Sequence, residues 1–241
     1  MNIIKKALVA CTFACSAALA PLSASAAPIE LALVIDGSGS ISSSQWQLQM
    51  QGYANAINNV LPTDGTVAVS VVQFSTNASL ELGMTEINSV ADRDSLSSFM
   101  LGINQSRGWT CISCGIVLAE ESFTGTADRA VIDISTDGFW NRGVNPNGDE
   151  NTVGTSAWAV ENGNATVVNA IGIGIGTEPD FNYGEDSFSM LANSFEDFQW
   201  MIEEKIRREI TPVPVPEPGA LALMVLGLLG LGAARLRRRS A

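Results

Sequence analysis

Residues 31–42 (LALVIDGSGSIS) join an apolar run to a loop in which one carboxylate and two hydroxyls alternate. In a tight loop after a strand, Asp36, Ser38 and Ser40 can point their oxygens to one side. Oxygen-only donors of this kind suit Mg²⁺, Mn²⁺ or Ca²⁺. Three donors do not fill the shell of such an ion, so the pattern predicts further ligands on other loops. The alternative interpretation is a plain turn, because Asp, Gly and Ser all favour turns.

The same loop does not fit phosphate binding or nucleophilic catalysis. It lacks the last glycine of the dinucleotide fingerprint G-x-G-x-x-G and the lysine of a P-loop. The nucleophile elbow G-x-S-x-G is absent, and the chain contains no histidine that could activate a serine. The missing histidine also excludes His-ligated zinc. We therefore expect a binding protein without catalytic residues.

The elements that must position this loop follow from hydrophobic periodicity. Short apolar runs predict strands at 29–35, 66–74, 78–82, 130–135 and 165–173. Helical spacing predicts helices at 43–61, 91–105, 115–123 and 154–162, and a long last helix whose apolar face runs from Phe188 to Ile206. The alternation predicts an α/β fold with a mostly parallel sheet, one antiparallel edge strand and helices on both faces.

In α/β sheets of this kind, ligands bind beyond the carboxyl ends of the strands. Asp36 ends the first strand, Asp137 follows the strand at 130–135, and Thr110 precedes a helix. Five oxygen-bearing residues on three loops are thus expected at one edge of the sheet.

The pattern Asp36-x-Ser38-x-Ser40, then Thr110, then Asp137 within STDG closely resembles the metal-ion-dependent adhesion site of von Willebrand factor A (vWA) domains. The resemblance implies a Rossmann-like vWA fold. It also implies that the two serines and the threonine bind Mg²⁺, or Mn²⁺ or Ca²⁺, directly, while the two aspartates act largely through water. The ion would then dock an acidic group of a protein or matrix ligand.

The resemblance covers roughly residues 29–210, and 182–210 is also similar to an uncharacterised bacterial subfamily of vWA domains. Ser43 and Ser44 stand where integrin-type domains place paired aspartates. A second, adjacent metal site is therefore not expected.

Two further features lie beside the predicted site. Cys111 and Cys114 directly follow the predicted threonine ligand, and outside the cytoplasm such a pair is expected to form a disulfide. The spacing also fits a thiol–disulfide redox centre, or a link that restrains the metal loop. Trp109 and Trp140 flank the two later loops and predict either an aromatic rim for a ligand or packing at the base of the loops.

The amino-terminal end of the chain has the pattern of a signal peptide. Lys5 and Lys6 precede an apolar stretch that closes on the small residues Ala24-Ser25-Ala26. We expect residues 1–26 to be removed and the vWA domain to span 27–210.

The carboxyl-terminal end predicts a sorting signal. A Pro-rich spacer (211–218) precedes a charge-free apolar segment (219–234), predicted to span a membrane, and a basic tail (235–241), predicted to stay cytoplasmic. This order, with Pro216, Glu217 and Pro218, closely resembles the PEP-CTERM signal. The resemblance implies cleavage by an exosortase and transfer from the inner membrane to the envelope or extracellular matrix. A permanent single-span anchor is the alternative.

The charge agrees with a surface that attracts cations. The formal net charge is −12, and all 25 acidic residues lie between Ala27 and Pro218. Nucleic acid is not an expected partner, because phosphate binding needs a basic surface. The sequence thus predicts an exported adhesion protein with a divalent metal site. The alternatives are a structural matrix or biofilm component without a specific ligand, and a C-x-x-C redox protein.

Overall fold

The apolar runs of the sequence form one central sheet in the computed structural model, which describes residues 29–211. The strands are β1 (Ile29–Asp36), β2 (Val67–Phe74), β3 (Ala78–Glu86), β4 (Arg129–Thr136), β5 (Val167–Ile173), β6 (Tyr183–Gly184) and β7 (Ser189–Ala192). Their order is β3-β2-β1-β4-β5-β6, and β7 also pairs with β5. The pairs β2–β3 and β5–β6 are antiparallel, and the others are parallel.

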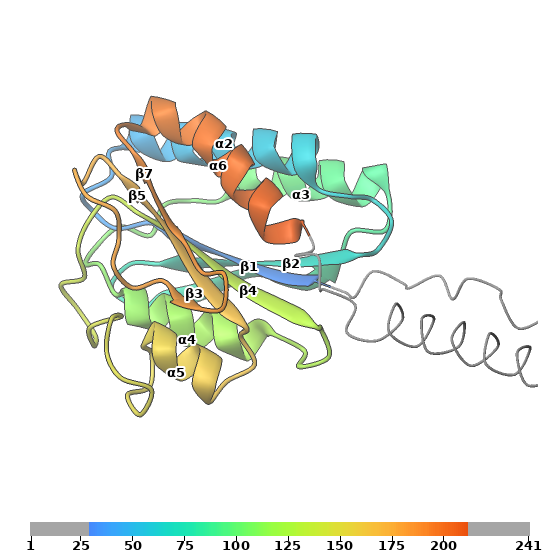
Figure 1. The fold of residues 1–241 in the computed structure, drawn as a ribbon. Coiled ribbons are helices and arrows are strands. Elements are labelled where there is room, and N and C mark those ends of the chain that lie inside the picture. The colour runs from blue at the N-terminus through green and yellow to red at the C-terminus, as the bar shows by residue number, and fades with distance from the viewer. Residues whose placement is uncertain (1–28, 212–241) are drawn as a thin grey trace, which may run out of the picture. The chain divides into compact units, whose positions relative to one another are not determined.

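Helices cover both faces of this sheet (Figure 1). One face packs against α2 (Ser43–Val60), α3 (Val90–Gly102) and α6 (Phe195–Ile210), and the other against α4 (Ile112–Ser122) and α5 (Ser156–Glu161). Each face buries its own apolar cluster, as expected for strands that are hydrophobic on both sides. The predicted α/β architecture, with a mostly parallel sheet and an antiparallel edge strand, is confirmed.

The predicted start of the last helix is wrong. Instead of a helix from Phe188, the structure has the short strand β7, which lies parallel to β5, and α6 begins only at Phe195. Ser194 starts this helix, because its hydroxyl accepts the backbone N–H of Asp197 at 3.2 Å. The apolar residues from Phe188 onward are spaced three and four apart, as on one face of a helix. The first part of this segment nevertheless forms backbone hydrogen bonds with the edge of the sheet.

The parallel register brings the predicted site to one edge of the sheet. Ile35 of β1 pairs with Ser135 of β4, so Asp36 ends its strand beside Thr136, one residue before Asp137. Ser42 then caps α2 through a reciprocal pair of hydrogen bonds with Gln45, which fixes where the loop after β1 ends.

The targeting segments lie outside the described part of the chain. These are the predicted signal peptide, the Pro-rich spacer with its Pro-Glu-Pro motif, the segment 219–234 and the basic tail. Within residues 29–211, no helix combines the length and apolar character needed to cross a bilayer.

Candidate functional site

Three loops meet at the carboxyl edge of the sheet: the first loop (37–42), the second loop (103–111) and the third loop (137–155). Backbone hydrogen bonds join the first two, since Gly39 N donates to the Gly108 carbonyl at 2.9 Å and Arg107 N donates to the Gly37 carbonyl at 2.8 Å. The structure therefore places the predicted ligands on loops that brace one another.

Side-chain oxygens of the first and third loops form a continuous chain. The Ser38 and Ser40 hydroxyls lie 2.9 Å apart, and the Ser40 hydroxyl donates to Asp137 Oδ1 at 2.7 Å. Ser38 is buried, Ser40 is exposed and Asp137 is half-buried, so the chain reaches solvent at its middle member, Ser40. Three of the five predicted ligands are thus in direct contact.

Asp36 lies beneath this chain of oxygens and is fully buried. Its Oδ1 accepts the backbone N–H of Ser38 at 2.8 Å, and its Oδ2 accepts the Thr136 hydroxyl at 2.7 Å. Burial raises the Asp36 pKa to about 6, although these hydrogen bonds oppose the rise. The residues around Asp36 therefore stabilise the negative charge of its carboxylate only in part.

Burial also raises the Asp137 pKa, against the hydrogen bond from Ser40. No Lys or Arg of residues 29–211 forms an ion pair with either Asp36 or Asp137. Two desolvated carboxylates and neighbouring hydroxyls form a hard oxygen donor set, which fits a divalent cation. The described residues contain no cluster of three or more His, Cys, Asp or Glu suited to metal, so a metal here would rely on hydroxyl ligands.

Thr110 joins the second loop to the third. Its backbone N–H donates to Asn141 Oδ1 at 2.8 Å, and its carbonyl accepts the Asn141 N–H at 3.1 Å. The side chain is buried, and its hydroxyl makes no hydrogen bond to the described residues. This leaves the threonine oxygen available to a ligand.

The cysteines and tryptophans predicted beside the site differ in exposure. Cys111 and Cys114 form a disulfide at the start of α4, with their Cα atoms 5.3 Å apart and Cys111 fully buried. Trp109, Trp140 and also Phe139 are exposed on the second and third loops. Phe139 was not among the predicted rim residues.

Sequence reasoning also missed residues that hold the loops in place. Gln105 donates from one amide nitrogen to the carbonyls of Ser38 and Ile41, both at 2.9 Å. Thr136 fixes the buried carboxylate, and Asn141 fixes the threonine loop. The only signal for these residues is a polar side chain at a strand end or in a loop, which is too common to single them out.

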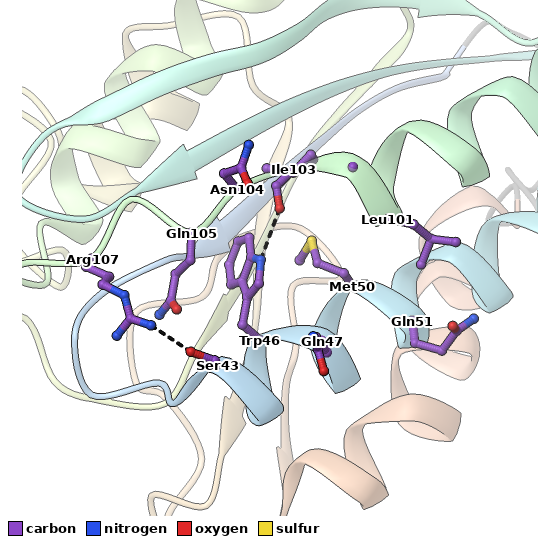
Figure 2. A pocket seen from close by; sticks show the side chains of 11 residues that line it. Ser43, Trp46, Gln47, Met50, Gln51, Leu101, Ile103, Asn104, Gln105 and Arg107 are labelled. Atoms are coloured by element: carbon purple, nitrogen blue, oxygen red, sulfur yellow. Dashed lines mark hydrogen bonds between the residues drawn. The ribbon is translucent and has the colours of Figure 1, made fainter.

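A hollow of about 640 Å³ lies beside the first loop, between the start of α2 and the segment after α3 (Figure 2). At one end, Arg107 Nη2 donates to the Ser43 hydroxyl at 2.8 Å, and deeper inside, Trp46 Nε1 donates to the Ile103 carbonyl at 3.1 Å. None of the five predicted metal ligands lines this hollow. It is a neighbouring surface that shares the second loop with the candidate site.

Family comparison covers most of the chain. Residues 26–214 match the family described as "Protein of unknown function (DUF1194)". The chain belongs to this family. Residues 214–239 of this DUF1194 protein match the PEP-CTERM protein-sorting motif, which marks it as an exported protein with a sorting signal. A search of curated proteins gave no match.

Solved structures show what fold this DUF1194 protein has. It resembles proximal thread matrix protein 1 from the mussel byssus (TM-score 0.61, 24% identity). The structure of that protein was solved with zinc in its metal-ion-dependent adhesion site (MIDAS) motif. That match covers 77% of this chain and 46% of the mussel protein, so the chain spans less than half of that relative. The vWF domain of the pilus tip protein Mfa5 from Porphyromonas gingivalis also matches (TM-score 0.54, 13% identity, covering 80% and 100%). The fold is therefore that of a vWA domain, as predicted.

Proposed function

We propose that this protein is an exported adhesion or matrix-binding protein that docks an acidic group through a divalent cation. The observation that carries the proposal is the oxygen chain Ser38–Ser40–Asp137, which lies over a buried carboxylate that has no cationic partner among the described residues. The sorting motif and the vWA fold support it.

Each residue of the site has a defined part in this proposal. Ser38, Ser40 and Thr110 would hold the ion through their hydroxyls, and Asp36 and Asp137 would stabilise it through bound water. The ion would supply a positive centre with an open coordination position. Because few charged ligands neutralise it, that position favours an acidic oxygen from a partner.

Surfaces next to the site would contact the rest of the ligand. Trp109, Phe139 and Trp140 are exposed on the two later loops, and exposed aromatic side chains are typical contact residues. The Arg107 guanidinium lies between the first loop and the hollow, where it would attract an anionic chain. These features define where a ligand would lie without specifying its chemical identity.

Calorimetric titration of the full chain with Mg²⁺, Mn²⁺, Ca²⁺ and Zn²⁺ tests the metal step. We expect saturable binding of at least one ion to the wild type and binding at least about tenfold weaker to Ser40→Ala. Ser44→Ala is the matched control, because it removes a nearby exposed hydroxyl that is not a predicted ligand. Absence of binding to the wild type would refute the proposal.

The ligand step needs a separate measurement. Beads that carry carboxylate groups are expected to retain the wild type with the bound metal and to release it on chelation. Retention that survives chelation, or metal-independent self-association, would instead favour a structural matrix component. Disulfide-exchange activity that requires Cys114 would favour the redox alternative.

A further inference from the structure

Three ionisable side chains form a cluster in the core between the sheet and α6. Asp133 lies on β4, Lys205 and Glu209 lie on α6, and none of the three is exposed to solvent. Lys205 Nζ is 2.5 Å from Asp133 Oδ1 and 2.6 Å from Glu209 Oε1. Burying three charges is costly even when they are paired, and this cluster has two acids for one base.

The surroundings hold the three groups in fixed positions. Asp133 pairs in register with Asn169 of β5, whose side-chain nitrogen donates to Glu209 Oε1 at 3.0 Å. The Asn169 oxygen accepts the backbone N–H of Phe188 at 3.0 Å, so its orientation is set from both sides. The Phe188 ring lies 5.8 Å from Lys205 Nζ. The amine therefore faces two carboxyl groups and an aromatic ring.

Two oxygens of the cluster lack partners. Asp133 Oδ2 and Glu209 Oε2 are buried and accept no hydrogen bond from the described residues. A single proton shared between the two carboxyl groups would satisfy both. Burial, followed by the charge of Asp133, raises the Glu209 pKa to about 8, so Glu209 carries a proton at neutral pH.

An amine in contact with a carboxyl group, beside a second carboxyl that holds a proton and away from water, is the arrangement required for amide formation. We propose that Lys205 Nζ and Asp133 Cγ condense into an intramolecular isopeptide bond, with Glu209 as the catalytic acid and base. The bond would tie β4 to the last described helix across 72 positions of sequence.

The proposed reaction balances without any co-reactant. Lys205 passes a proton to the Asp133 carboxylate, which leaves a neutral amine and a neutral acid, the forms that an apolar core favours. The amine lone pair attacks Asp133 Cγ while Glu209 donates its proton to the carbonyl oxygen. Glu209 then takes a proton from the nitrogen and passes it to one of the two hydroxyls on Cγ. The Cγ–O bond of that hydroxyl breaks, its oxygen leaves as water, and the remaining hydroxyl returns its proton to Glu209 as the amide carbonyl forms. One N–C bond forms, one C–O bond breaks, and Glu209 is regenerated.

The product would replace two buried charges by an uncharged amide. It would also transmit force from the carboxyl-terminal helix into the sheet, where a non-covalent helix could be pulled away. The bond is independent of the candidate metal site, so failure of either proposal leaves the other standing.

Peptide mapping of the full chain tests this proposal. The purified protein is reduced, denatured and digested with chymotrypsin, which cleaves after Phe123, Phe139 and Trp200. We expect segment 124–139 to be joined to the segment that begins at 201, lighter than their sum by about 18 Da, the mass of the released water. Fragmentation should locate the branch at Asp133 and Lys205.

Two variants serve as controls. Lys205→Arg keeps the positive charge but is expected to give two separate segments, and Glu209→Gln is expected to slow bond formation by about a hundredfold. Separate segments at full mass from the wild type, or a branch at any other residue, would overturn the proposal, and full-rate bond formation in Glu209→Gln would overturn the role of Glu209. The wild-type result decides the main question even if a variant does not fold.

Discussion

The substitution Asp36→Asn separates the charge of the buried aspartate from its shape. An asparagine can keep accepting the Ser38 N–H through its oxygen, where the distance is now 2.8 Å. Its amide nitrogen would face the Thr136 hydroxyl, which can turn its own proton to the Gly138 carbonyl 2.9 Å away. Every polar atom would then have a partner, so the substitution is not expected to disrupt the fold.

The expected size of the effect follows from the pKa of the group. Burial raises the Asp36 pKa from 3.8 to about 6 in the folded protein. The pKa of Asp36 is higher in the folded protein than in the unfolded chain. The free energy of unfolding of the metal-free protein is therefore undiminished below pH 3.8 and falls as the pH rises through about 6. The loss at neutral pH is about 3 kcal/mol of unfolding free energy. Asparagine carries no charge and avoids this loss.

Thermal unfolding in a chelator and in excess metal checks this reasoning. In the chelator at neutral pH, the variant is expected to melt about 6–12 °C above the wild type. Metal at a hundredfold excess over its dissociation constant should stabilise the wild type by about 2.7 kcal/mol and leave the variant unchanged. Asp128→Asn, which removes an exposed charge outside the site, should behave as the wild type.

Two outcomes would refute the reasoning. If the variant is less stable than the wild type in the chelator, the hydrogen bonds of the buried carboxylate stabilise the folded protein by more than its desolvation destabilises it. If metal stabilises the variant as much as the wild type, the ion does not bind over this aspartate.

Three further predictions concern the loops. Ser40→Ala should reduce metal affinity at least about tenfold while lowering the unfolding free energy by about 1–2 kcal/mol, because its hydroxyl makes two hydrogen bonds, one of them exposed. Equal affinity of variant and wild type by calorimetry would contradict this prediction. Reduction of the Cys111–Cys114 disulfide should weaken metal binding because the threonine loop loses its restraint, and equal affinity of reduced and oxidised protein would contradict that. Gly143→Ala should cost about 2 kcal/mol in denaturant unfolding, because Gly143 has φ +80° and an added Cβ would come within 2.2 Å of a side chain of α4. Gly83→Ala, which has open space around it, should cost less than about 1 kcal/mol, and equal costs would refute the steric explanation.

The edge of the sheet that carries the candidate site could be predicted from the sequence for a geometric reason. Strand-end carboxylates at Asp36 and Asp137 follow buried apolar runs, and parallel strands end at the same edge. Alternation of serines within one short loop then suffices to place their oxygens close together. These relations are local in sequence or follow directly from strand direction.

The supports of the site could not be predicted in the same way. Gln105 braces the first loop from a segment whose course is set by the packing of α3, and Asn141 meets Thr110 across a distance of 31 positions. Loop conformation of this kind depends on tertiary contacts that periodicity does not encode. The same limit explains β7, where pairing with β5 outweighed a helical spacing.

The buried charge cluster could be predicted from the sequence only in part. Lys205 and Glu209 fall three and seven positions after Ile202, so both lie on the apolar face of the last helix, where a solvated charge would not be expected. A base and an acid on that face require polar groups on the facing sheet, and Asp133 is the acid within the apolar run of β4. Periodicity alone can therefore indicate that such a cluster exists. It cannot distinguish an ion pair from a covalent bond, because that depends on a 2.5 Å contact and on two carboxyl oxygens without partners among the described residues.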